Sequence, residues 1–132
     1  MIHTLDVTSR RREEVIDITA LVTGAVALAG VPDGVATLFC PHTTGALTIQ
    51  EAADPDVARD LTATFSRLVP LRGDYRHAEG NSDAHVKAAL VGCAQTFLVE
   101  HGRPRLGRWQ GIFFCELDGP RERQLWLKIL PG

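Results

Sequence analysis

The chain lacks the long apolar runs and the paired cysteine motifs that mark membrane and disulfide-rich proteins. No apolar stretch approaches the ~20 residues that span a bilayer, and the longest, residues 20–29, is interrupted by Thr23 and Gly24. At the N-terminus the charges follow the apolar residues, which is the reverse of a secretory signal. Three cysteines lie far apart with no C-x-x-C pair: Cys40, Cys93 and Cys115. We therefore expect a soluble, cytoplasmic protein with reduced thiols and no membrane partner.

An excess of charge of one sign is also missing. The chain has 14 Lys and Arg against 16 Asp and Glu, for a net charge of −2. The only basic run, residues 10–12, is followed at once by Glu13 and Glu14, which is typical of a solvated turn. Because no basic face extends from this run, we do not expect nucleic acid as a partner.

What is present is the composition of an ordinary globular domain. The 132 residues are 45% hydrophobic and 23% charged, and they contain no internal repeat or linker. This size and composition predict a single domain over residues 1–132, with one core and room for one polar pocket.

Hydrophobic periodicity and turn signals predict strands and helices in an irregular order. Strands are expected at residues 2–7, 35–40, 46–50, 96–100, 111–117 and 123–130. Helices are expected from a cap at Asp17 or Thr19 to Gly30, after Asp54-Pro55, and from a cap at Asn81 or Ser82 to Gly92. Since regular βαβ alternation is absent, the predicted fold class is α+β with largely antiparallel sheets.

Three segments carry further expectations. The nearly all-apolar strand at residues 35–40 predicts burial on both faces. The loop at residues 70–81 is long for so small a domain, and long ordered loops are often functional. The helix after Asp54 carries apolar residues at helical spacing, which predict a buried stripe: Val57, Leu61, Phe65 and Leu68.

Three histidines lie where chemistry is plausible. His42 follows a predicted strand, His77 lies in the long loop, and His85 lies about one turn into the third helix. Three imidazoles with an open fourth position would form a catalytic zinc-type site, and histidine is also the usual acid–base group near neutral pH. The irregular spacing leaves the alternative that His42 and His85 are hydrogen-bonded structural residues and His77 is exposed. His3 and His101 are interpreted as ordinary edge and turn residues.

Residues 79–82, Glu-Gly-Asn-Ser, lead into the start of the third helix. Free N–H groups and the helix dipole make such a start suitable for phosphate. Lys87 lies about one turn further on, and Arg121 and Arg123 flank the last predicted turn. The alternative is a simple helix cap in a surface loop.

Glu116 is the carboxylate that most needs an explanation, because it follows the apolar residues 112–115. A carboxylate in such a strand needs a partner or a cation to offset its desolvation. Asp54 is most simply a helix cap. Trp109 and Trp126 either stack on a heteroaromatic ligand or pack in the core. Further carboxylates lie near these features: Glu51, Glu79 and Asp118.

Three segments together resemble the YjbQ family, an uncharacterised protein family associated with a secondary thiamine-phosphate synthase activity. They are HTTGALTIQEAADPDV, DYRHAEGNSDAHVKAALVG and LGRWQGIFFCELDGPRER, in the family's order. The resemblance covers roughly residues 35–130. It implies a two-sheet β-sandwich with flanking helices that assembles as a homotrimer. Apolar strands such as residues 112–115 also favour cover by another subunit.

The resemblance also singles out residues for the site. The family histidines correspond to His42, His77 and His85, and its other polar positions correspond to Glu79, Gly80, Asn81, Lys87, Trp109, Gln110, Glu116, Asp118 and Arg121. Three positions depart from the family pattern. Arg108 stands where threonine is usual, Gly45 replaces a small alanine or serine, and Gln50 replaces a frequent asparagine.

The leading functional interpretation is a transferase that joins hydroxymethylpyrimidine diphosphate to thiazole phosphate and releases pyrophosphate. In this interpretation phosphate is held by Asn81, Ser82, Lys87 and Arg121. His42, His77 and His85 hold a divalent metal ion, zinc or magnesium, or His42 and His85 transfer protons while Glu116 orients a histidine. One alternative is a metal-dependent hydrolase of a small phosphorylated metabolite. Another is a non-catalytic metal- or ligand-binding trimer.

Overall fold

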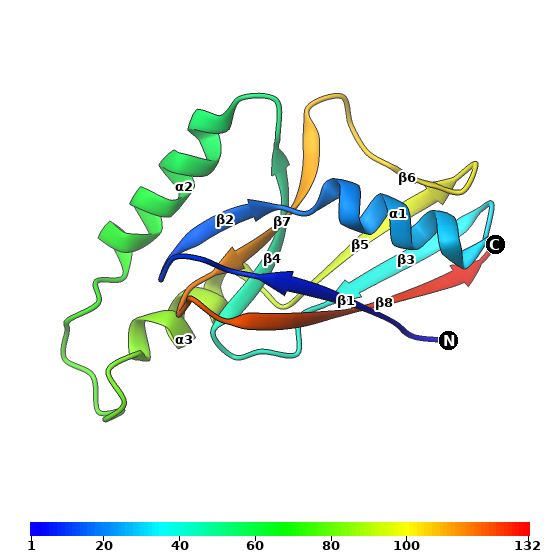
Figure 1. Ribbon diagram of the computed structural model, residues 1–132. Coiled ribbons are helices and arrows are strands. Elements are labelled where there is room, and N and C mark those ends of the chain that lie inside the picture. The colour runs from blue at the N-terminus through cyan, green and yellow to red at the C-terminus, as the bar shows by residue number, and fades with distance from the viewer.

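The strands divide between two antiparallel sheets in the computed structural model, which describes residues 1–132 (Figure 1). The five-stranded sheet has the order β1 (His3–Thr8), β8 (Glu122–Pro131), β3 (Gly34–Phe39), β5 (Ala94–Glu100), β6 (Arg103–Arg105). The three-stranded sheet has the order β2 (Glu14–Asp17), β7 (Gln110–Glu116), β4 (Gly45–Glu51). The helices are α1 (Thr19–Ala29), α2 (Pro55–Leu68) and α3 (Ser82–Val91). The predicted α+β fold with two antiparallel sheets is confirmed.

The main core lies between the two sheets and is closed by α1. Leu38 and Leu127 of the larger sheet meet Leu47 and Phe114 of the smaller sheet, and Val22 of α1 joins them. All of these side chains are buried. The alternation of buried and exposed residues along β3 and β8 follows from this one-sided packing.

A second, smaller cluster covers the other face of the three-stranded sheet. Ala84 and Ala88 of α3 pack on Ala46, Cys115 and Leu117. Strand β7 is therefore buried on both faces, and Ile112 to Cys115 need no cover from another subunit. The expectation that these residues favour assembly is wrong, because the main core covers Ile112 and Phe114 and the cluster under α3 covers Cys115.

Two short strands are missing from the sequence-based prediction. Strand β2 pairs with the buried strand β7, but its residues continue the charged cluster that was interpreted as a turn. Strand β6 has only three residues, one of them proline, so it is too short to show alternation. Both strands are recognisable only from the partner on which they pair.

The expectation of burial on both faces of β3 is wrong. Only alternate residues of β3 are buried, while Val35 and Phe39 lie on the exposed outer face of the sheet. An apolar run of this length does not by itself distinguish two-sided from one-sided burial.

The expected buried stripe on α2 is also wrong for this chain. Val57, Leu61 and Phe65 are only partly buried, and Leu68 is 71% exposed. The helix packs on β2 and otherwise leans away from the sheets (Figure 1). Helical periodicity identifies residues that share a face, but it does not establish that another element covers that face.

The helix ends largely follow the predicted signals. The Asp54 carboxylate accepts a hydrogen bond from the backbone N–H of Asp56 at 2.9 Å, which confirms the predicted cap. Helix α1 ends at Gly30, whose φ of 71° lies in the left-handed region that glycine tolerates. The Asp17 carboxylate accepts from the backbone N–H of Thr19 at 2.9 Å.

We predict that Phe114→Ala lowers the free energy of unfolding by ~3–5 kcal/mol, because it leaves a cavity between the two sheets. Leu61→Ala is expected to cost only about 1 kcal/mol, because that side chain is partly solvated. Denaturant unfolding of both variants measures the difference. A loss for Leu61→Ala as large as that for Phe114→Ala would contradict this placement.

Candidate functional site

A cavity of about 590 Å³ lies where the end of β3, the link to β4 and the C-terminal half of α3 meet. We call it the histidine pocket, because it contains two histidines. The link contributes Pro41, His42 and Thr43, and α3 contributes His85, Ala88 and Ala89. The remaining lining residues are Phe39, Cys40, Gly45, Gly92 and Cys93.

The local sequence explains why these elements meet. Pro41 cannot donate to a β ladder, so the regular pairing of β3 stops before it and the chain turns toward β4. Along α3, positions 85, 88, 89 and 92 recur at helical spacing and therefore share the side that borders the pocket.

His42 is held against strand β8. Its Nε2 atom lies 3.0 Å from both the backbone nitrogen and the backbone oxygen of Gln124, so a neutral ring satisfies one of these contacts at a time. Burial lowers the pKa of His42, and the positive charges of Arg123 and Arg121 lower it further. The ring is therefore held in its neutral form near neutral pH.

His77 and His85 come together at the start of α3. Their rings pack edge to face with centroids 5.3 Å apart. The Nε2 atom of His77 also lies 3.1 Å from Oδ1 of Asn81. The loop histidine His77 thus lies beside His85 of α3, and His42 shares the pocket with His85.

The chain forms no group of three or more His, Cys, Asp or Glu side chains that could hold a metal ion. The three histidines form two pairwise arrangements, one edge-to-face contact and one shared pocket, rather than one coordination sphere. Within a single chain they do not fit zinc or magnesium, and metal binding remains a prediction.

Asn81 connects the long loop to the turn before β8. Its Nδ2 atom donates to Oδ2 of Asp118 at 2.9 Å, and the Arg121 guanidinium donates to the same oxygen at 3.0 Å. Asn81 occupies the cap position of α3, but its side chain makes no capping hydrogen bond. The expected cap position is therefore confirmed, but the Asn81 side chain does not cap the helix because it contacts His77 and Asp118 instead. Ser82 is the first residue of α3.

Lys87 lies in a second network, away from solvent. Its side chain is 2% exposed, and its ammonium donates to Asp83 at 2.8 Å and also contacts Glu13. Arg12 makes two hydrogen bonds to the same Asp83 carboxylate, at 3.0 and 3.1 Å. A phosphate would have to compete with two carboxylates for Lys87, so the structure does not favour its predicted phosphate-binding role.

This network changes one expectation, that of a solvated turn, and contains one buried residue that the sequence analysis missed. Arg12 belongs to the run interpreted as a solvated turn, yet it is two-thirds buried and pairs with a buried carboxylate. Burial alone would raise the pKa of Asp83, but hydrogen bonds from Arg12 and Lys87 outweigh it and hold that pKa below its ordinary value. Sequence reasoning missed Asp83, although an acidic residue on the buried side of a helix always requires such partners.

Glu116 is completely buried, and it has the cationic partner that the sequence required. The Arg123 guanidinium donates to both carboxylate oxygens, with 2.9 Å from Nε to Oε1. Ser9 donates to Oε1 at 2.6 Å, and the backbone N–H of Leu117 donates to Oε2 at 3.0 Å. These donors outweigh the burial that would raise the pKa of Glu116, and that pKa lies below its ordinary value.

Glu116 does not contact a histidine, so the role predicted for it in orienting one is at most indirect. No histidine is among its partners, because both of its oxygens are already occupied. Glu116 instead positions Arg123, whose guanidinium also donates to the Thr44 hydroxyl at 2.9 Å. Through Arg123 it therefore fixes the link that carries His42.

Trp109 and Gln110 lie away from the histidine pocket. Trp109 directly precedes β7 and Gln110 is its first residue, at the end opposite Glu116, and seven residues of strand span ~20 Å. The exposed Trp109 ring packs under Arg108, with 4.7 Å from the guanidinium carbon to the ring centroid. Gln110 accepts the Gly107 N–H at 2.8 Å and closes the turn. A single chain does not bring these residues to the site that includes His42.

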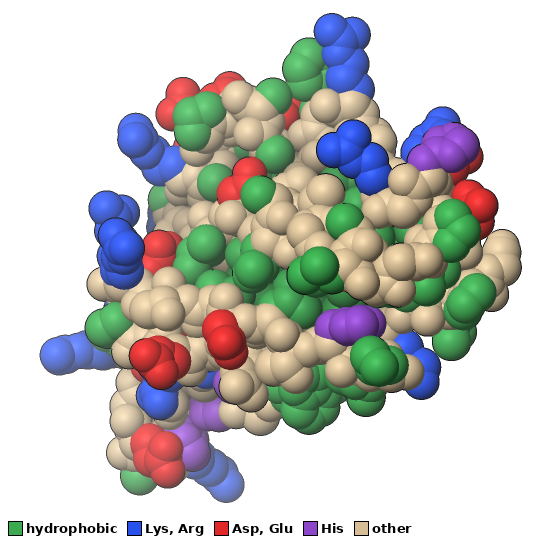
Figure 2. All heavy atoms as spheres, turned by 45° about the vertical axis from the view of Figure 1, so that its right-hand side comes forward, with side chains coloured by type: hydrophobic (Ala, Val, Ile, Leu, Met, Phe, Trp, Pro, Cys, Tyr) green, Lys and Arg blue, Asp and Glu red, His purple; other side chains and the backbone are tan.

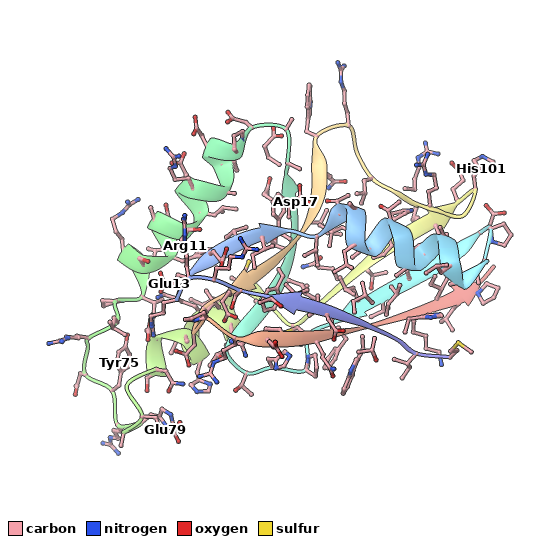
Figure 3. All side chains as sticks on the ribbon, viewed as in Figure 1. Arg11, Glu13, Asp17, Tyr75, Glu79 and His101 are labelled. Carbon is pink, nitrogen blue, oxygen red and sulfur yellow. The ribbon has the colours of Figure 1, made fainter.

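Glu79 lies at the tip of the long loop, near Tyr75 in the same loop (Figure 3). Its side chain is exposed, and its Oε2 atom is 3.7 Å from Nε2 of His77.

Among the departures from the family pattern, Gly45 has a visible cause. A Cβ atom there would lie 2.7 Å from the Phe114 ring, so this core accepts only glycine without a shift. Gln50 is exposed and accepts the Glu51 N–H at 3.0 Å.

By its class, the protein is therefore a two-sheet α+β domain with a histidine pocket between the β3–β4 link and α3. The model of the family described as UPF0047 protein YjbQ-like matches residues 3–132. The chain therefore belongs to this family.

Relatives match nearly the whole chain. UPF0047 protein MJ1081 of Methanocaldococcus jannaschii is 46% identical, covering 98% of this chain and 94% of the relative. UPF0047 protein YugU of Bacillus subtilis is 45% identical, covering 98% and 99%. A YjbQ/UPF0047 family protein of known structure from Clostridium acetobutylicum has a TM-score of 0.93 at 48% identity, covering 97% and 99%. None of the helices in this chain has the length and apolar character needed to cross a membrane.

We predict that stability falls on acidification in two stages. The lowered pKa of His42 means that the unfolded chain takes up a proton more readily than the folded chain. The contribution of His42 to the free energy of unfolding is therefore fully present above about pH 6.5. It is lost as the pH falls toward the pKa of His42 in the folded chain. Glu116, whose pKa is also lowered, adds a further loss below pH 4.5.

Urea unfolding at a series of pH values measures this dependence for the wild type and His42→Gln. The variant should lose the upper stage and retain the lower one. His101→Asn is the control, because His101 lies at the opposite end of the molecule from Glu79 and its φ of 54° is one that asparagine tolerates (Figure 3). Identical profiles for His42→Gln and the wild type would refute the assignment.

Proposed function

We propose that this protein is a transferase that joins hydroxymethylpyrimidine diphosphate to thiazole phosphate and releases pyrophosphate. The observation that carries the proposal is the histidine pocket, in which His42 and His85 from two separate elements border one cavity of about 590 Å³. A cavity of this size suits a small metabolite. The secondary thiamine-phosphate synthase activity associated with the family supports the choice of reaction.

The reaction places its main demand on the leaving group. The bond between the pyrimidine methylene carbon and the diphosphate oxygen breaks, and the thiazole nitrogen forms the new carbon–nitrogen bond. Negative charge develops on the departing diphosphate, so cations and hydrogen-bond donors must be positioned there. In this proposal Arg121 meets that demand, because its side chain is half exposed and its charge already acts on His42.

The α3 start supplies a second set of donors. Because Asn81 makes no capping hydrogen bond, the first-turn N–H groups at Ser82 and Asp83 have no side-chain acceptor from the cap residue. Such groups favour an anion. We assign the second phosphate to this helix start, with His85 between it and the cavity. His42, held neutral, contributes hydrogen bonding or proton transfer, and no step passes through a metal ion.

We predict that His42→Ala and His85→Ala each lower the rate of thiamine phosphate formation by about 10²–10⁴-fold, the usual range for lost acid–base groups. The measurement combines both substrates with purified protein and follows the coupled product and pyrophosphate. His101→Asn serves as the matched histidine control and should keep the wild-type rate. Slow rescue of cells that lack their main synthase is the corresponding test in vivo.

The results also separate the rival functions. Release of phosphate from either substrate alone, without coupling, would replace the transferase by a hydrolase of small phosphorylated metabolites. Saturable binding without any turnover would indicate a ligand-binding module. Full activity of both histidine variants would remove the histidine pocket from the mechanism.

We also propose that the protein assembles as a homotrimer through the outer face of the five-stranded sheet. Large apolar side chains lie exposed on three neighbouring strands of that face: Val35, Phe39, Leu98, Trp126 and Leu130. Phe39 and Trp126 stack with ring centroids 5.9 Å apart and form a rigid centre for the face. Hydrophobic side chains also gather along the lower edge of the view in Figure 2. Exposed apolar faces of this kind are typical of interfaces.

We predict a mass of about three times 14.4 kDa from light scattering coupled to size exclusion. Trp126→Glu should convert the trimer to monomer, because it buries an unpaired charge in the interface. Leu28→Glu is the control, since Leu28 is also apolar and is even more exposed than Trp126 but lies on α1. A wild-type monomer at micromolar concentration would contradict the proposal, and so would a Trp126→Glu trimer.

A further inference from the structure

Two cysteines lie side by side at the end of the β3–β5 ladder. The antiparallel register pairs Gly34 with Val99 and continues to Phe39 with Ala94. The next pair in this register is Cys40 with Cys93. The backbone N–H of Cys40 donates to the carbonyl oxygen of Cys93 at 2.7 Å, so the two residues remain directly opposite each other beyond the last regular pair.

This arrangement suits a disulfide bond. Directly opposed residues in a hydrogen-bonded antiparallel pair have Cα atoms ~5.5 Å apart, which lies within the range that a disulfide spans. Side chains that are opposite in register also leave the sheet on the same face. Both cysteines line the histidine pocket, and the charge of a Cys93 thiolate acts directly on Cys40.

The three thiols differ in access. Cys93 is exposed, whereas Cys40 is buried behind it and its Sγ atom lies 3.8 Å from the carbonyl oxygen of His42. Cys115 lies in the other sheet and belongs to the second hydrophobic cluster, where burial raises its pKa to about 12. Solvent therefore reaches one thiol, and that thiol has one neighbour in register.

We propose that Cys40 and Cys93 form a reversible intramolecular disulfide that closes one wall of the histidine pocket. The disulfide would form whether or not the chain has the transferase activity proposed above. It would join the end of β3 to the start of β5 and alter the cavity that His42 and His85 border.

The oxidant is a low-molecular-weight disulfide of the glutathione class. The Cys93 thiolate attacks one sulfur of the oxidant, forms a mixed disulfide and releases one thiolate. The Cys40 thiolate then attacks Sγ of Cys93, forms the protein disulfide and releases the second thiolate. In sum, two protein thiols are oxidised, one oxidant disulfide is reduced to two thiols, and the two protons of the protein thiols pass to them.

The test incubates the purified full chain with oxidised glutathione and counts free thiols after denaturation. The count should fall from three to one, the intact mass should decrease by two hydrogens, and digestion without reductant should join the peptides that contain Cys40 and Cys93. Treatment with a dithiol reductant should restore all three thiols. A count that remains at three, or a wild type that stops at the glutathione adduct, would overturn the proposal.

Single variants assign the order of the two steps. Cys40→Ser should stop at a stable glutathione adduct on Cys93, whereas Cys93→Ser should show no oxidation because the accessible thiol is gone. Cys115→Ser is the matched control and should form the disulfide as the wild type does. Cys93→Ser changes an exposed side chain, so its result stands even where Cys40→Ser disturbs the core. A bond to Cys115 or between chains would contradict the assignment.

Discussion

The buried pair between Glu116 and Arg123 is the interaction on which the rest of this structure depends. A fully buried carboxylate is tolerable only when a cation and further donors surround it, and the partners of Glu116 come from three segments: Ser9, the backbone of residues 117–118, and Arg123. Arg123 extends the same contact to Thr44, and the next residue, Gln124, contacts His42. One charge inside the fold therefore fixes the junction of both sheets and the position of a candidate catalytic ring.

The sequence alone was sufficient for the elements that carry local signals. The Asp54 cap, the Gly30 stop and the alternating β8 strand all depend on residues close to one another in the chain. The features it did not predict depend on distant residues. Strand β2 exists because β7 pairs with it, and α2 remains half exposed because β2 is its main packing partner and only Phe65 reaches the second hydrophobic cluster. Periodicity contains no information on such partners.

The candidate site shows the same division. The sequence could indicate that Glu116 needs a cation, but it could not identify Arg123 among fourteen basic residues. It could indicate His42, His77 and His85, yet the structure gathers them as two pairs rather than three ligands. It grouped Trp109 with Glu116 because they are neighbours in one motif, although the length of β7 separates them. Proximity along a strand is a poor guide to proximity in a site.

The Asn81 side chain bridges His77 and Asp118 and does not cap α3. This choice of partners affects how the loop before α3 opens. The segment from residue 70 to residue 80 has no regular structure, and within it the Tyr75 hydroxyl contacts only the Pro70 carbonyl at its own start. Release of the Asn81 amide together with the His77–His85 ring contact would free most of this segment while the two sheets stay folded. Opening of this kind costs far less free energy than global unfolding. Opening of this loop is therefore expected to separate the His77–His85 ring pair and to expose His85 while the core stays folded.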